Sequence, residues 1–174
     1  MKLAKVFKEN KQFTLFSILA LVVVGVAVFA PQIAPYDPLD AVMLESLQAP
    51  SSAHLFGTDK LGRDLLSRVI FGTRTSLIMT LCLVAVIFVI GTFLGVIAGY
   101  FGGIVDGVIM RIADMMISFP GLVLAIAIAG MLGPNLVNAV ISIAAVSWTK
   151  YARLARSLVM KIRDRDYVSA AIVT

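Results

Sequence analysis

The sequence has little charge, little cysteine and little histidine. Only 14% of its 174 residues are charged, whereas 60% are apolar, and a soluble domain carries about 25% charged residues. Water cannot solvate the surface of such a chain, so the composition predicts a protein of the lipid bilayer. Cys82 is the single cysteine, which excludes an intramolecular disulfide and a cysteine metal site. We interpret it as a small buried apolar residue.

Motifs of enzymatic chemistry are also absent from the sequence. It contains no HExxH, no GxSxG and no Walker lysine motif, so any ATP must be hydrolysed by another chain. His54 is the only histidine, and a lone histidine in a loop is more often a surface group than a ligand. We therefore predict no catalytic residue, no metal site and no cofactor.

Three uncharged segments are long enough to cross a membrane. They cover residues 12–36, 75–105 and 115–149, and a span needs about 20 helical residues. The first segment exceeds the roughly 7–15 residues of a signal-peptide core, so we predict a retained helix from Phe13 to Ala30. Pro31 and Pro35 are expected to end it. Gly102 and Gly103 are expected to end the second helix.

The third uncharged segment is too long for one helix. Its 35 residues would extend about 52 Å. The turn sequence Leu-Gly-Pro-Asn at 132–135 divides it, which predicts one helix from near Ile104 to near Leu132 and another from near Leu136 past Trp148. Pro120 is expected to kink the first of these. The fold class predicted is thus all-α, an integral membrane helical bundle with four transmembrane helices.

Basic residues cluster near both ends of the chain. Lys2, Lys5, Lys8 and Lys11 precede the first span, and a second cluster lies between residues 150 and 165. The positive-inside rule with four spans puts both termini in the cytoplasm and residues 32–74 outside, whereas three spans would put the second cluster outside. Basic clusters beside apolar runs favour membrane lipid over nucleic acid as the partner.

Small and charged residues within the spans suggest how the helices pack. Gly91, Gly95 and Gly99 recur every fourth residue, a pattern that lets helices approach closely, and we expect them to pack the second span on the third. A pore-lining stripe is the alternative. The spacing of Arg111 and Asp114 allows them to pair on one helix face, near a cytoplasmic helix end that also carries Asp106.

Three stretches of the sequence carry a family resemblance. They are HLFGTDKLGRDLLSR at 54–68, then AGYFGG at 98–103 with Asp106, MRIAD at 110–114 and Pro120, and finally WTKYAR at 148–153, RSL at 156–158 and YVSAA at 167–171. In family order and spacing they resemble the inner-membrane permeases of peptide and nickel ABC importers, specifically the second of two permease subunits.

The first stretch also has a physical reading. Its motif residues in the loop outside the membrane are Gly57, Thr58, Asp59, Gly62, Arg63 and Asp64. The glycines permit a tight turn, and Thr58 or Asp59 could cap a following helix. Apolar residues at 65–70 then predict a short helix along the outer surface. The three divisions expected are residues 1–31 with the first span, the loop 32–74, and a partial permease domain at 75–174.

The resemblance implies a permease in the inner (plasma) membrane. Its implied partners are a homologous second permease, two ATP-binding ATPase subunits and an extracytoplasmic solute-binding protein, and its implied cargo is a di- or oligopeptide or nickel. The family carries a coupling segment, E-A-A-x-x-x-G, that docks on the ATPase. The matching positions here are Tyr167, Val168, Ser169, Ala170 and Ala171.

The same comparison with the family pattern predicts a shortened chain. Ile172 departs from the pattern, and the glycine of the coupling segment would be the residue after Thr174. We therefore expect the rest of that segment and the last two of six spans to be missing. A truncated nontransporting membrane fragment or scaffold protein is the alternative function, favoured by the short length and opposed by the resemblance.

Overall fold

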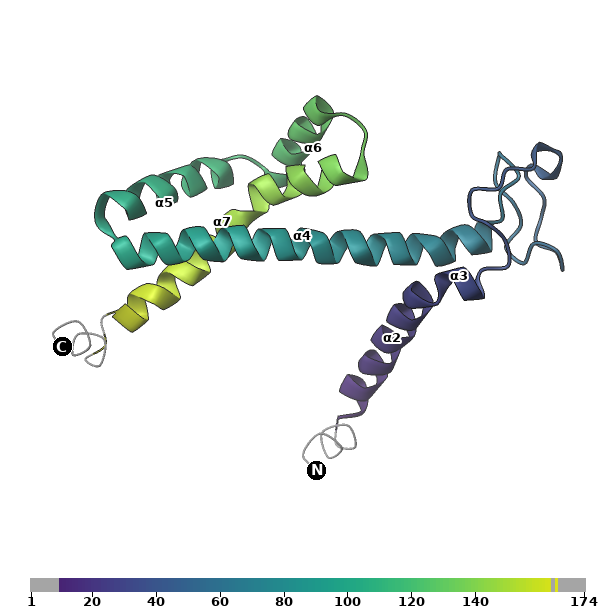
Figure 1. Ribbon diagram of the computed structural model, residues 1–174, viewed down its shortest axis with the longest axis horizontal. Coiled ribbons are helices and arrows are strands. Elements are labelled where there is room, and N and C mark those ends of the chain that lie inside the picture. Colours follow the sequence, from purple (N-terminus) through teal and green to yellow (C-terminus); the bar gives the residue numbers. More distant parts are fainter. Residues whose placement is uncertain (1–9, 164, 166–174) are drawn as a thin grey trace. The chain divides into compact units, whose positions relative to one another are not determined.

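The computed structural model describes residues 10–163 and residue 165 (Figure 1). Its elements are α2 (Lys11–Val28), α3 (Ala30–Ile33), the 3-10 helix η1 (Met43–Glu45), α4 (Leu65–Phe101), α5 (Gly103–Ser118), α6 (Gly121–Leu132) and α7 (Leu136–Arg163). Every one of these elements is helical, which confirms the prediction of an all-α protein. The chain divides into two compact units, residues 1–78 and 79–174, with α4 passing through the boundary.

The first unit begins with the apolar helix α2. Only Ala27 of its 18 residues is buried, and a helix that is apolar on all sides is typical of a membrane span. Pro31 lies in the first turn of α3 rather than directly ending the long helix. A proline is tolerated there because its missing N–H would have had no partner in the helix.

A compact loop joins α3 to α4 in the first unit. Its backbone pairs with itself: the Leu47 N–H donates to the Asp59 carbonyl over 3.0 Å, and the Thr58 N–H donates to the Gln48 carbonyl over 3.1 Å. Gly62 has a φ of +75°, and a Cβ built on it would collide with the Val42 carbonyl. Only glycine satisfies both conditions at this turn.

Helix α4 is longer than predicted. It starts at Leu65 and has 37 residues, about 55 Å at 1.5 Å per residue. The prediction of a separate short surface helix at 65–70 is therefore wrong, because no helix-breaking residue separates Leu65 from Thr75. Gly72 lies in open space and is tolerated. The helix ends where predicted, since Gly102 and Gly103 both have positive φ angles, 64° and 52°.

In the second unit, the helix predicted from Ile104 to Leu132 is two helices. α5 and α6 meet at an angle of 92°, so the prediction of a kinked single helix is wrong. Pro120 removes a backbone donor, and it forces Phe119 into an extended conformation with φ −93° and ψ 146°. The residue before a proline avoids the helical region for this steric reason.

Two helices of the described residues, α2 and α4, are long and apolar enough to cross a membrane. The bent pair α5 and α6 makes a third if it is one span. Four spans stay a prediction, because α7 is not among these candidates and becomes strongly basic toward its end. The packed core of the second unit centres on Ala113, Trp148 and Ala152.

Candidate functional site

The three glycines of α4 form a seam against α7. A Cβ built on Gly91 would lie 2.6 Å from the Trp148 carbonyl oxygen, and one on Gly99 would lie 2.8 Å from the Val159 Cβ. One on Gly95 would collide with the Ala152 carbonyl. The helices thus approach too closely for any side chain on this stripe, as small residues permit in membranes.

The helix that faces these glycines differs from the one predicted. We expected the third span, but α7 supplies all the facing atoms. Small side chains on α7 make the approach possible: Ala152 is fully buried and Ala155 is 9% exposed. The spacing of glycines identifies a packing face in the sequence, but it cannot identify the partner helix.

Two arginine–aspartate ion pairs join α5 to α7. Arg156 donates from Nε and Nη2 to the two carboxylate oxygens of Asp106, and Arg153 donates to Asp114. The prediction that Asp114 pairs with Arg111 is therefore wrong. A two-point pair fixes the orientation of both side chains, and the Asp106 side chain is only 16% exposed.

The end of α7 also contacts the end of α4. The Arg163 guanidinium donates to the Tyr100 carbonyl over 3.0 Å. The last carbonyls of a helix have no partner within it, so an arginine there satisfies them and complements the helix dipole. Together with Asp106–Arg156 and the glycine seam, this contact holds the basic half of α7 against the α4–α5 turn.

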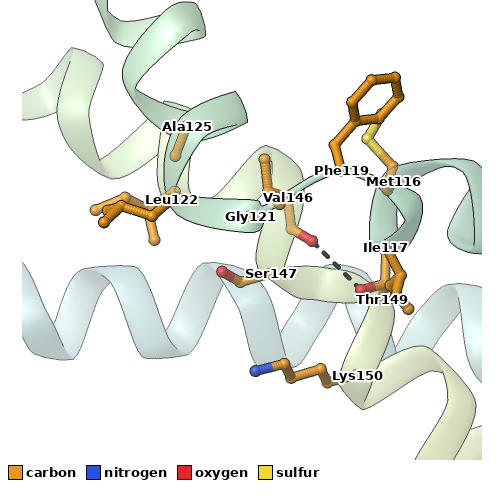
Figure 2. Close-up of a pocket in the computed structure, with 11 residues that line it drawn as sticks. Met116, Ile117, Phe119, Gly121, Leu122, Ala125, Val146, Ser147, Thr149 and Lys150 are labelled. Carbon is orange, nitrogen blue, oxygen red and sulfur yellow. Dashed lines mark hydrogen bonds between the residues drawn. The ribbon is translucent and has the colours of Figure 1, made fainter.

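A cavity of about 390 Å³ lies where α5, α6 and α7 meet (Figure 2). Its walls are mostly apolar and include Met116, Phe119 and Leu122, while Ser147 and Lys150 add a hydroxyl and a cation. This cavity was not predicted from the sequence. Pro120 was the available signal, because the break it causes separates α5 from α6.

In the first unit, Asp59 holds the turn of the GTDKLGRD motif together. Its Oδ1 accepts the N–H groups of Leu61 over 2.8 Å and Arg63 over 3.0 Å. Its Oδ2 accepts the Arg63 Nε–H over 2.9 Å and also bonds Arg68. Desolvation, the largest influence, raises the pKa of Asp59, but the hydrogen bonds from Arg63 and Leu61 outweigh it and lower the pKa to about 2.

Asp64, rather than Thr58 or Asp59, caps the helix that follows the motif. It directly precedes α4, and its Oδ2 accepts both the Ser67 N–H and the Ser67 hydroxyl over 2.7 Å. A cap must stand next to the first helical residue, so the earlier candidates are too distant. Thr58 instead accepts the Gln48 N–H over 2.9 Å and bonds the Glu45 carbonyl.

His54 is buried, with 6% exposure, so its interpretation as a surface group is wrong. Its Nδ1 lies 3.0 Å from Asp64 Oδ1, and its Nε2 lies 3.3 Å from Glu45 Oε2. The hydrogen bond with Asp64 is the main reason that the pKa of His54 is raised, although desolvation opposes it. For Asp64, desolvation raises the pKa most, but hydrogen bonds from Ser67 and His54 reverse this and lower it.

The remaining predicted residues fall elsewhere. The coupling positions Tyr167, Val168, Ser169, Ala170 and Ala171 lie outside the described residues. Within residues 10–163, no group of three histidine, cysteine or acidic side chains is arranged to hold a metal ion. The motif residues of the loop form hydrogen bonds and a turn within the loop itself. The glycines of α4 lie in its contact with α7.

Apolar helices joined by a glycine seam and by arginine–aspartate pairs define this chain as a helical membrane protein. A family model for the binding-protein-dependent transport system inner membrane component matches residues 91–174. A second, for the N-terminal transmembrane domain of oligopeptide transport permease C, matches residues 2–50. The chain belongs to this family of transport-system inner membrane components, as the resemblance predicted.

Individual relatives agree with this assignment. The dipeptide transport system permease protein DppC of Haemophilus influenzae is 40% identical over 96% of this chain and 59% of its own length. The probable D,D-dipeptide transport system permease protein DdpC of Escherichia coli is 41% identical over 98% of this chain and 57% of its own. The nickel transport system permease protein NikC of Escherichia coli is 41% identical over 79% of this chain and 50% of its own. The chain thus spans little more than half the length of these relatives.

Proposed function

We propose that the chain is a membrane-spanning permease subunit of an ABC importer that carries di- or oligopeptides, or nickel. The observation that carries the proposal is the 40–41% identity to peptide permeases over nearly the whole chain. The apolar helices α2 and α4 suit such a role, since both are long enough to cross a bilayer. The NikC relative keeps nickel open as the cargo.

The proposed partners follow from the family. They are a second permease subunit, two ATPase subunits, an extracytoplasmic solute-binding protein and the surrounding membrane lipid. ATP hydrolysis belongs to the ATPase subunits in this proposal, so this chain is not itself an enzyme. Its task is to change conformation when the ATPases do, which requires different contacts in the two states.

The contacts at the end of α7 support a mechanical role for that helix. The proposed coupling positions, 167–171, follow α7 after a few residues. Arg156 is paired with Asp106 at the start of α5, and Arg163 binds the last carbonyls of α4. A displacement at the coupling segment would therefore reach α4 and α5 through short polar contacts rather than through α7 alone.

The cavity between α5, α6 and α7 is the proposed point of contact with the solute. Its apolar wall with two hydroxyl groups, from Ser147 and Thr149, and one ammonium group, from Lys150, suits a small peptide that carries a carboxylate. Sites of this size with few polar groups are usual for small ligands. A peptide cargo fits this lining better than a metal ion, because the Met116 thioether is its only sulfur, and thiolate, imidazole and carboxylate ligands are absent from the residues that line it.

The proposed orientation has both termini in the cytoplasm and the GTDKLGRD loop outside. Single cysteines at Lys60→Cys and Arg165→Cys, in a Cys82→Ala background, are labelled with a membrane-impermeant thiol reagent on intact cells. We expect position 60 to react and position 165 to react only after permeabilisation. The reverse pattern contradicts the orientation without bearing on the family.

Transport is tested in cells that lack their own second permease subunit but keep its partners. The chain is expressed with an affinity tag, and uptake of labelled dipeptide and labelled nickel is compared with co-purification of the ATPase subunits. We expect the ATPases to co-purify and one solute to enter in an ATP-dependent manner. Lys150→Gln should reduce dipeptide uptake while leaving ATPase co-purification unchanged. The proposal is contradicted if the chain inserts into the membrane but neither retains the ATPase subunits nor supports uptake of either solute.

A further inference from the structure

His54 is clamped between two carboxylates inside the loop of the first unit. Each ring nitrogen faces one oxygen, Nδ1 toward Asp64 at 3.0 Å and Nε2 toward Glu45 at 3.3 Å. Only the doubly protonated imidazolium carries a donor on both nitrogens. The neutral ring would leave one nitrogen lone pair facing a carboxylate, which loses a hydrogen bond and adds repulsion.

The hydrogen bonds of His54 and Asp64 connect three parts of the chain, which are η1, the start of α4 and the segment after α3. Glu45 comes from η1, and Asp64 caps α4 through Ser67. The Ser67 hydroxyl also accepts the Tyr36 N–H over 3.1 Å, which connects the chain after α3 to the same group. The Tyr36 ring lies 4.9 Å from the His54 ring, centroid to centroid. Loss of the hydrogen bonds between His54 and the two carboxylates therefore loosens the loop from α3 and α4, the helices that border it.

We propose that His54, Glu45, Asp64 and Ser67, which we call the His54 cluster, form a pH-sensitive lock that holds residues 43–64 on the start of α4. The charged groups that face the imidazole are the carboxylates of Glu45 and Asp64, and Tyr36 covers one face of the ring. The nearby arginines Arg63 and Arg68 are engaged by Asp59 instead. No cation is therefore paired with Asp64 in competition with His54 among the described residues.

The direction of the pH dependence follows from linkage. The pKa of His54 is raised above 6.5 in the folded loop. The stabilisation that His54 gives the folded loop is fully present below about pH 6.5 and is lost as the pH rises through the raised pKa. The pKa of Asp64 is lowered, so its contribution is present above its ordinary value and is lost only in stronger acid. The lock is therefore closed in mild acid and released in alkali.

The size of the effect is fixed by the same shift. Each unit by which the pKa of His54 exceeds its reference value multiplies the opening constant of the loop about tenfold between the acid and alkaline limits. The amides of Leu47, Thr58 and Leu65 report opening, because each donates a backbone hydrogen bond within the loop. Their exchange protection, corrected for the intrinsic exchange rate, should fall by that factor as the pH rises.

The test uses the full chain in lipid nanodiscs. The pKa is read from the nuclear magnetic resonance signal of the only imidazole in the chain, and amide hydrogen exchange is followed from about pH 5 to about pH 9. We expect a pKa above 6.5 and a fall in protection with the same midpoint. The Ala139 amide, which bonds the Asn135 carbonyl in the second unit, serves as an internal control and should show no such step.

Two variants make the outcome decisive. His54→Gln should abolish the pH step, and Glu45→Gln should shift the midpoint to lower pH while leaving the Asp64–Ser67 cap in place. Glu45 has a half-exposed side chain (42%), so its variant is expected to keep the fold even if His54→Gln does not. The proposal is overturned if the imidazole titrates at or below pH 6.5 or if amide protection does not change with pH. It is also overturned if the midpoint is unchanged in Glu45→Gln.

Discussion

Replacing Gly95 with leucine should weaken the contact between α4 and α7. Gly95 is the central glycine of the seam, and even a methyl group there would meet backbone. A built Cβ would collide with the Ala152 carbonyl oxygen and lie 2.8 Å from the Ala155 Cβ. Backbone cannot move aside as the end of a flexible side chain can, so the helices themselves must separate.

The distances set the size of the disturbance. Carbon atoms pack best about 3.5–4.0 Å apart, so a Cβ at Gly95 alone requires the helices to separate by about 1 Å. The rest of a leucine side chain would increase this separation and expose Gly91 and Gly99 to lipid. Overpacking of this kind costs about 1–3 kcal/mol, and the gain in helix propensity, about 1 kcal/mol, offsets only part of it.

Gly107 provides a matched control on α5. Nothing lies within 4 Å of a Cβ built there, so Gly107→Leu makes the same chemical change without a clash. Both variants are purified in the same detergent, and thermal unfolding is followed by circular dichroism. We expect a clearly lower midpoint for Gly95→Leu and an unchanged or higher midpoint for Gly107→Leu. Equal midpoints for the two variants would refute the packing role of the seam.

Three further predictions concern Asp106, Asp59 and Pro120. Asp106→Asn should destabilise the chain by about 1–3 kcal/mol, because the partly buried Arg156 keeps its charge but loses its ionised partner. In the same unfolding assay, the double exchange Asp106→Arg with Arg156→Asp should recover part of the lost stability. Ordering of the loop should weaken as the pH falls from about 4 toward the Asp59 pKa of about 2. Asp59→Asn should make this step in hydrogen exchange smaller and leave the part that Asp64, whose pKa is also lowered, contributes. Pro120→Ala should restore a backbone donor and a helical residue 119, so spin labels on α5 and α6 should report an angle much smaller than 92°.

Several features of this protein follow from the sequence alone. Long uncharged runs require apolar helices in lipid, because no other regular structure within a single segment satisfies its backbone groups there. The break at Gly102–Gly103 and the turn at 132–135 were also predictable, since positive φ angles and a proline act locally. The family resemblance rested on residue identity and spacing, and the comparisons confirm it.

Other features depended on contacts between residues far apart in the sequence. The spacing of Gly91, Gly95 and Gly99 identifies a packing face but not its partner, which is α7, over fifty residues later in the chain. Asp114 had a candidate cation three residues away, yet Arg153 binds it, because α7 brings that guanidinium alongside α5.

His54 shows the same limit most clearly. A single histidine in a polar loop carries no sequence signal of burial, and the two carboxylates that enclose it lie nine residues before it and ten residues after it. Only the folded loop brings them to its two ring nitrogens. Local steric rules act between neighbours and can be read from the sequence, whereas the choice of partner depends on which surfaces the tertiary structure brings together.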